Sequence, residues 1–143
     1  MSTNKPNTGF WIVAVIAMIW NLIGVMMYLG TVYMTEDARA MLTAEQLDVL
    51  DATPAWVTGL FALAVFSGAL AALLLLLRKK LAVMLFALSL LCILINNGYS
   101  FLATDAPEAY GLVQGYIMPL IVILIGIFLY VFSKQSAKKG WLS

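Results

Sequence analysis

Three adjacent cations, Arg78, Lys79 and Lys80, interrupt two long apolar runs and constrain the fold of this chain more than any other feature. An unbroken leucine run, Leu73 to Leu77, precedes them, and a second apolar run begins at Leu81. Because burying three charges in hydrocarbon would be prohibitive, the break is predicted to be a tight turn at a membrane surface. Basic residues in short loops stay on the cytoplasmic side, so the turn also predicts which way the chain faces.

The composition is that of an integral membrane protein. Of the 143 residues, 64% are hydrophobic and 10% are charged, whereas soluble domains carry about 25% charged residues. No basic face of any length exists, so nucleic acid is not expected as a partner. One cysteine and no histidine argue against an internal disulfide and against a zinc or transition-metal site, and no cofactor is predicted.

Four apolar segments are long enough to cross a bilayer, at about residues 10–33, 54–77, 81–103 and 109–132. A helix needs about 20 apolar residues for this purpose. Thr53 and Pro54 are predicted to be the N-cap and first helical residue of the second span. Pro119 removes a backbone hydrogen bond and should kink the fourth span.

The first loop, residues 34 to 53, is the longest and holds five of the seven acids, namely Glu36, Asp37, Glu45, Asp48 and Asp51. Thr43 and Gln46 have the spacing of a capping box. Leu47 and Leu50 follow at helical spacing. This loop is therefore predicted to contain a short amphipathic helix on the outer surface.

The charges separate by side when both termini are placed in the cytoplasm. The cytoplasmic set then has seven of the eight cations and no acid: Lys5, Arg78, Lys79, Lys80, Lys134, Lys138 and Lys139. The outer set is Arg39 with all seven acids, Asp105 and Glu108 included. This asymmetry predicts an all-α, four-helix transmembrane bundle with cytoplasmic N and C termini.

None of the four predicted spans contains Asp, Glu, Lys, Arg or His. Proton relays need titratable groups inside the membrane. Bilayer hydrolases and acyl transferases need a nucleophile with its base, or a metal. The chain is therefore not expected to be an enzyme.

Neutral polar residues recur on the predicted spans, and two interpretations of them stay open. Asparagines in hydrocarbon can form interhelical hydrogen bonds that fix helix register. They can also line a polar pocket that opens outward, for which the candidates are Asn21, Asn96, Asn97, Tyr99 and Gln114. On the second span, Ala64, Gly68 and Ala72 form a seam of small residues that would let another helix approach closely.

Five short segments of the chain carry a resemblance to known proteins, namely Gly9-Phe10-Trp11, Ile19-Trp20-Asn21-Leu22, Pro54-Ala55-Trp56-Val57-Thr58-Gly59, Leu77-Arg78-Lys79-Lys80 and Lys139-Gly140-Trp141-Leu142-Ser143. With these segments the chain resembles a group of small, uncharacterised bacterial inner-membrane proteins, some of which are labelled sugar transporter. The resemblance covers nearly the whole chain. It implies a multi-pass protein of the bacterial inner membrane and a transport role, and it assigns no catalytic or binding residues.

Two functions are consistent with these features. The first is a small transporter-like or solute-binding protein with a neutral polar pocket in the outer half of the bundle. It is expected to work as an oligomer, because four spans can hold a small pocket but hardly the two gates that a transporter needs. The alternative is a non-transporting accessory or scaffold subunit that uses the small-residue seam. The expected partners are the lipid bilayer and either further copies of the chain or another membrane protein.

Overall fold

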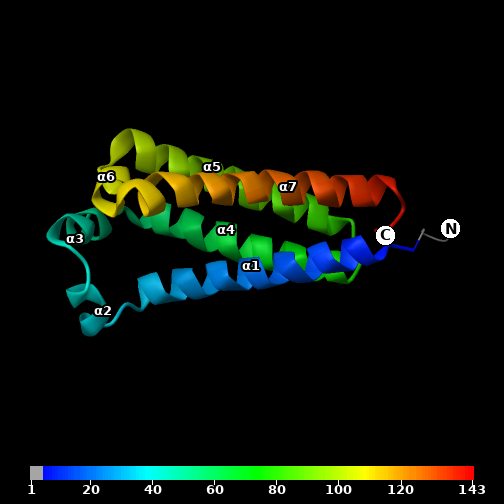
Figure 1. Ribbon diagram of the computed structural model, residues 1–143, viewed down its shortest axis with the longest axis horizontal. Helices are drawn as coiled ribbons and strands as arrows, with labels where there is room; N and C mark the ends of the chain where they lie inside the picture. Colours follow the sequence, from blue (N-terminus) through cyan, green and yellow to red (C-terminus); the bar gives the residue numbers. More distant parts are fainter. Residues whose placement is uncertain (1–4) are drawn as a thin grey trace.

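The computed structural model describes residues 5–143, and every regular element in this range is a helix. The long helices are α1 (Thr8–Val32), α4 (Ala55–Leu76), α5 (Leu81–Ala103) and α7 (Met118–Lys138), which lie lengthwise in one bundle (Figure 1). Two short helices, α2 (Glu36–Ala40) and α3 (Ala44–Asp51), connect α1 to α4, and a third, α6 (Ala106–Gly111), lies between α5 and α7.

Four helical segments are long and apolar enough to cross a membrane, and the fourth of them extends from Ala106 to Lys138. The predicted all-helical fold with four such helices is therefore confirmed. The fourth segment is not one regular helix, because the π-helix Leu112–Ile117 separates α6 from α7. Pro119 lies in the first turn of α7, directly after the π-helix.

The two ends of the bundle carry opposite charges. The beginning of α1, the C-terminus and the α4–α5 turn lie at one end (Figure 1), which is termed the basic end because seven of the eight cations lie in or beside these segments. The loop helices α2, α3 and α6 lie at the other end, termed the acidic end, and all seven acids belong to this region. In residues 5–143, all the acids therefore lie at one end of the helices and all the cations except Arg39 lie at the other end.

Local capping explains where several helices begin. Asn7 Oδ1 accepts a hydrogen bond from Phe10 N at 2.9 Å and caps α1. Thr43 and Gln46 form a complete capping box at α3, each side chain accepting from the backbone N–H of the other. The predicted cap of α4 is wrong by one residue, since Pro54 is itself the N-cap. The hydroxyl of Thr53 instead donates to Val49 O, at 2.9 Å, at the end of α3.

The most tightly packed core lies at the basic end. Phe10 is 1% exposed, and Leu75 and Leu142 are fully buried. The Phe10 ring lies 5.9 Å from the Phe132 ring and 5.7 Å from the Trp141 ring. These contacts join the beginning of α1, the end of α4, the end of α7 and the residues after it.

The last three residues form a clasp on the α4–α5 turn, termed here the tail clasp (residues 141–143). Ser143 N donates to Arg78 O at 2.8 Å, and Lys80 N donates to Ser143 O at 3.0 Å. Arg78 Nε donates to Trp141 O at 2.8 Å. Arg78 has a φ of 58°, which is a left-handed backbone conformation that residues other than glycine rarely adopt. The turn predicted from three adjacent cations therefore also anchors the carboxyl end of the chain.

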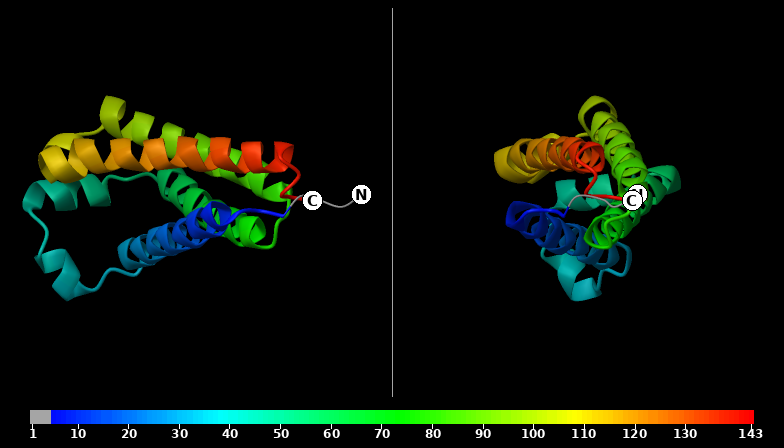
Figure 2. Two further views of the ribbon diagram at one scale, coloured as in Figure 1. Left: turned by 45° about the vertical axis from the view of Figure 1, so that its right-hand side comes forward. Right: turned by 90° about the vertical axis from the view of Figure 1, so that its right-hand side faces the viewer.

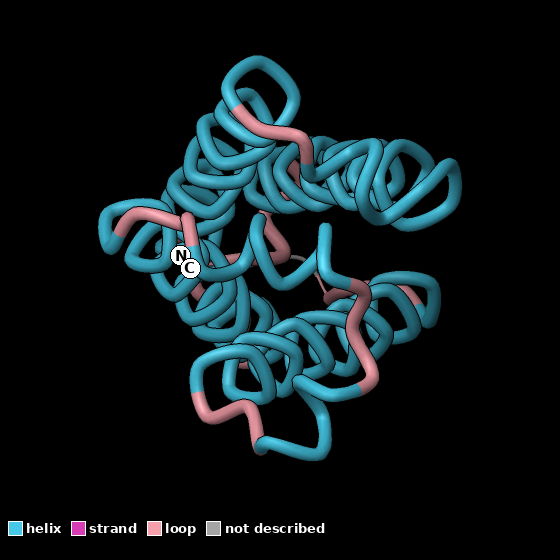
Figure 3. Tube along the Cα trace, turned by 90° about the vertical axis from the view of Figure 1, so that its left-hand side faces the viewer, coloured by secondary structure: helices cyan, strands magenta, loops and turns pink. Residues whose placement is uncertain are grey.

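The four long helices pack in sequence order around an open arc. α1 packs on α4, α4 on α5, and α5 on α7, whereas α1 and α7 stand at the two ends of the arc. Figure 2 shows this arc from the basic end and Figure 3 shows it from the acidic end. Near the basic end the aromatic cluster around Phe10 bridges α1 and α7, so the arc is closed there by side chains.

Candidate functional site

Asn21 lies in a helix–helix seam. Its Nδ2 donates to Ala17 O of the same helix at 2.8 Å. Its Oδ1 lies so close to Gly68 on α4 that a Cβ at position 68 would collide with it. Ser89 Oγ donates to Ala64 O at 2.7 Å, which links α5 to α4 at the same level. Asn21 therefore packs between helices and needs the glycine opposite it.

The small-residue seam on α4 is used inside the chain. Ala64, Gly68 and Ala72 are all buried, Ala72 completely. The close approach that small residues permit is realised here by Asn21 from α1 and Ser89 from α5. The seam therefore offers no free surface to another protein.

The remaining candidate pocket residues are spread over the acidic half of the bundle. Asn96 and Asn97 are half-buried, and Asn97 Nδ2 donates to Ile93 O of its own helix at 3.0 Å. Gln114 lies on the π-helix and is exposed. The Tyr99 ring packs edge-on against the Trp56 ring at 5.0 Å. Of Asn21, Asn96, Asn97, Tyr99 and Gln114, only Tyr99 lines the cavity described next, and the side-chain amides of Asn21 and Asn97 each donate a hydrogen bond to a carbonyl of their own helix.

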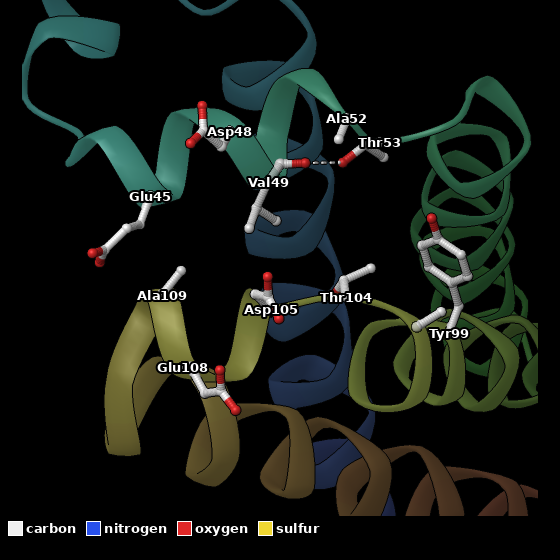
Figure 4. Close-up of a pocket in the computed structure, with 11 residues that line it drawn as sticks. Glu45, Asp48, Val49, Ala52, Thr53, Tyr99, Thr104, Asp105, Glu108 and Ala109 are labelled. Atoms are coloured by element: carbon white, nitrogen blue, oxygen red, sulfur yellow. Dashed lines mark hydrogen bonds between the residues drawn. The ribbon is translucent and has the colours of Figure 1, made fainter.

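A cavity at the acidic end of the bundle is termed the acidic pocket. It has a volume of about 640 Å³ and is open to the surroundings on one side. Figure 4 shows α3 on one side of the pocket and the corner between α5 and α6 on the other. Its lining consists of Glu45, Asp48, Val49, Ala52, Thr53, Tyr99, Ala103, Thr104, Asp105, Glu108 and Ala109. The volume falls in the range of about 300–1,000 Å³ that is typical of small-molecule sites, and Tyr99 is the one predicted pocket residue in the wall.

Hydrogen bonds hold the two sides of the acidic pocket in place. Gln46, already in the capping box of α3, donates from Nε2 to Ala109 O of α6 at 3.3 Å. Thr104 Oγ1 donates to Ser100 O at 2.6 Å and accepts from Ala106 N at 3.2 Å, which bends the chain from α5 into α6. These hydrogen bonds from Gln46 and Thr104 therefore fix the positions of α3 and α6 on the two sides of the pocket.

The acidic pocket has a negative wall. Among the residues that the structure describes, four carboxylates and no lysine or arginine line it. Arg39, the cation of this end, pairs with Asp51 outside the pocket, with Nη2 at 3.0 Å from both carboxylate oxygens. A concave surface with charges of one sign focuses the field and raises the local concentration of counterions.

The four carboxylates do not converge on one point. Asp48 and Glu108 point to opposite sides of the view in Figure 4, while Asp105 lies between α3 and α6. Within residues 5–143, no group of three or more His, Cys, Asp or Glu side chains is arranged to hold a metal ion. The separation of the carboxylates suits a positively charged organic molecule better than a single metal ion.

The acidic pocket was not predicted from the sequence, although the spacing of its acidic residues could have indicated it. Glu45 and Asp48 are three residues apart on α3, and Asp105 and Glu108 are three apart at the start of α6. Residues with this spacing share one face of a helix. Each pair was predicted only as part of an acidic outer loop, because the sequence does not say that α3 packs on α6.

No family model matches this chain, and no curated protein or solved structure matches it either.

Proposed function

We propose that this chain is a transporter-like, solute-binding membrane protein and that the acidic pocket binds a small organic cation. The observation that supports this most directly is a cavity of about 640 Å³ with four carboxylates in its wall. A solute of this class is attracted by the negative field and makes ion pairs within the pocket. The site proposed from the structure is thus acidic and peripheral, in place of the neutral pocket expected from the asparagines.

The aromatic residues beside the acidic pocket support the same class of solute. Tyr99 lines the cavity, and Trp56 packs on it at 5.0 Å. A ring face attracts an organic ammonium ion by about 0.5–2 kcal/mol, depending on how far the site is desolvated. Carboxylates and a ring together favour a quaternary or substituted amine over a simple inorganic cation.

Burial of the small-residue seam on α4 argues against the alternative of an accessory or scaffold subunit. That function was inferred from the seam of Ala64, Gly68 and Ala72. The seam is buried against α1 and α5 of the same chain. A further copy of the chain can still complete the arc between α1 and α7, so we retain a homo-oligomer as part of the proposed function.

Choline and its uncharged isostere 3,3-dimethylbutanol test the proposed binding. We expect the purified protein to bind choline and to discriminate against the isostere, as measured by calorimetric titration in detergent. The double variant Asp48→Asn/Asp105→Asn should weaken choline binding at least tenfold, which corresponds to about 1.4 kcal/mol. Raising the salt concentration should also weaken choline binding by the parent protein, because salt screens the electrostatic attraction.

The control is Glu36→Gln/Asp37→Asn, which removes the same number of charges from α2. Both residues are exposed and lie outside the pocket wall. This variant should bind choline within about twofold of the parent. Equal losses in the two double variants, or equal binding of choline and the isostere, would refute the proposed site.

The proposal includes an orientation in which the acidic end faces outward and both termini lie in the cytoplasm of a bacterial cell. It rests on the rule that lysine and arginine are retained on the cytoplasmic side. A cysteine at exposed Glu36 should react with a membrane-impermeant maleimide in intact cells. A cysteine at exposed Lys138 should react only after the membrane is permeabilised. The reverse pattern would overturn the orientation.

A further inference from the structure

A second cavity lies at the basic end, between the beginning of α1 and the end of α7. It has a volume of about 240 Å³. Phe10, Val13, Phe132 and Trp141 supply apolar wall, while Asn7, Gln135 and Lys139 supply polar groups. The cavity therefore has the mixed lining that an amphiphile requires, with an apolar part and a charged part in contact with one protein site.

The cationic part of this lining is held in position. Lys139 Nζ stands 4.7 Å from the centre of the Trp141 ring, and Trp141 is itself fixed by the tail clasp through Arg78. Five residues earlier, in α7, Lys134 Nζ stands 5.8 Å from the centre of the Tyr130 ring. Lysines and aromatic rings that accompany each other at the end of a spanning helix are typical of the headgroup level of a bilayer.

The surrounding field favours an anion. Seven cations and no acid belong to the segments of the basic end. The beginning of α1 borders the cavity through Asn7 and Gly9, and the amino terminus of a helix carries a partial positive charge. An anionic headgroup in the cavity would thus meet a lysine and a helix terminus, while its acyl chains would follow the apolar residues Val13 and Phe132.

We propose that the cleft between the beginning of α1 and the end of α7 binds one anionic phospholipid, with its phosphate beside Lys139. The lipid links the two helices that stand at the ends of the arc, at the same level as the Phe10 cluster. This inference is independent of the acidic pocket, which lies at the opposite end of the bundle.

Native mass spectrometry of the purified full-length protein, with equimolar phosphatidylglycerol and phosphatidylcholine, tests the proposal. We expect one molecule of phosphatidylglycerol to be retained in about fivefold preference over phosphatidylcholine. Lys139→Gln should abolish the preference by removing the cation. Gly9→Phe should abolish it by filling the cavity without any change in charge, since a Cβ at this exposed glycine meets nothing closer than Asn7 Oδ1 at 3.4 Å.

The matched control is Lys138→Gln, which removes one charge from the adjacent, exposed residue that does not line the cavity. This variant should keep the preference within about twofold. A parent without any preference for phosphatidylglycerol would overturn the proposal. The proposal would also be overturned if Lys138→Gln and Lys139→Gln reduced the preference for phosphatidylglycerol equally while Gly9→Phe kept it. The lipid would then be attracted by the basic surface as a whole and not bound in the cavity. Thermal unfolding of each variant checks that the bundle is intact.

Discussion

Replacement of Gly115 by alanine is expected to destabilise the protein by about 3 kcal/mol, the upper end of the usual range for overpacking a well-filled site. Gly115 is buried on the π-helix, where α6 folds back against it. An added Cβ would overlap Pro107 O and would lie 2.7 Å from Pro107 C and 2.8 Å from Pro107 Cα. These are backbone atoms of α6, so relief requires the helix to move, whereas a flexible side chain could simply turn away.

The Gly115→Ala effect should be visible as a lower unfolding midpoint in detergent, followed by circular dichroism. Gly98→Ala is the matched control, because a Cβ at Gly98 would meet nothing within 4 Å. Alanine is favoured over glycine in a helix by up to about 1 kcal/mol, so this control should be neutral or slightly stabilising. If both variants lost the same stability, close packing of α6 on the π-helix would be the wrong explanation.

Gly115→Ala should also affect the acidic pocket. α6 supplies Glu108 and Ala109 to the wall, and Ala109 O accepts the hydrogen bond from Gln46 that holds α3 in place. A displaced α6 should therefore weaken choline binding together with stability, while Gly98→Ala leaves both unchanged.

Replacement of Leu142 by alanine is expected to destabilise the protein by about 3 kcal/mol, within the range for large-to-small changes in a core. Leu142 is the penultimate residue, yet its side chain is fully buried in the core of the basic end. Truncation leaves a cavity beside Phe10 and Leu75 and weakens the tail clasp on Arg78. The expected result is a lower unfolding midpoint in detergent.

Leu102→Ala is the control for Leu142→Ala, since it makes the same chemical change at a side chain that is 90% exposed. It should cost less than about 0.5 kcal/mol, as is usual for surface changes. A Leu142→Ala variant as stable as the Leu102→Ala variant would show that the tail is not docked. A loss of phosphatidylglycerol binding in Leu142→Ala is expected as a secondary effect, because Trp141 depends on the same clasp.

Much of the fold was predictable because its causes are local. Apolar runs long enough to span a bilayer gave the four long helices, and the Thr43 and Gln46 pair marked the beginning of α3 correctly. The cap of α4 was predicted one residue too early, since Thr53 can bond either forward to α4 or back to Val49, and the structure has the second bond. The π-helix before Pro119 had no local signal of its own.

The candidate site was less predictable because its parts come from distant segments. The asparagines suggested a pocket, but Asn21 and Asn97 donate to carbonyls four residues earlier in their own helices. Sequence spacing predicts which residues share a helix face. It does not predict which of two available partners a side-chain amide will bond.

By itself the sequence determined the number of long apolar helices and the separation of cations from acids, because hydropathy and charge act on each segment independently of the others. Only the tertiary structure decided that α3 packs on α6 around an acidic pocket, that Gly68 receives Asn21, and that the last residues close on Arg78. Each of these contacts joins residues far apart in the chain, and their energy depends on distances that are set only when the helices have packed.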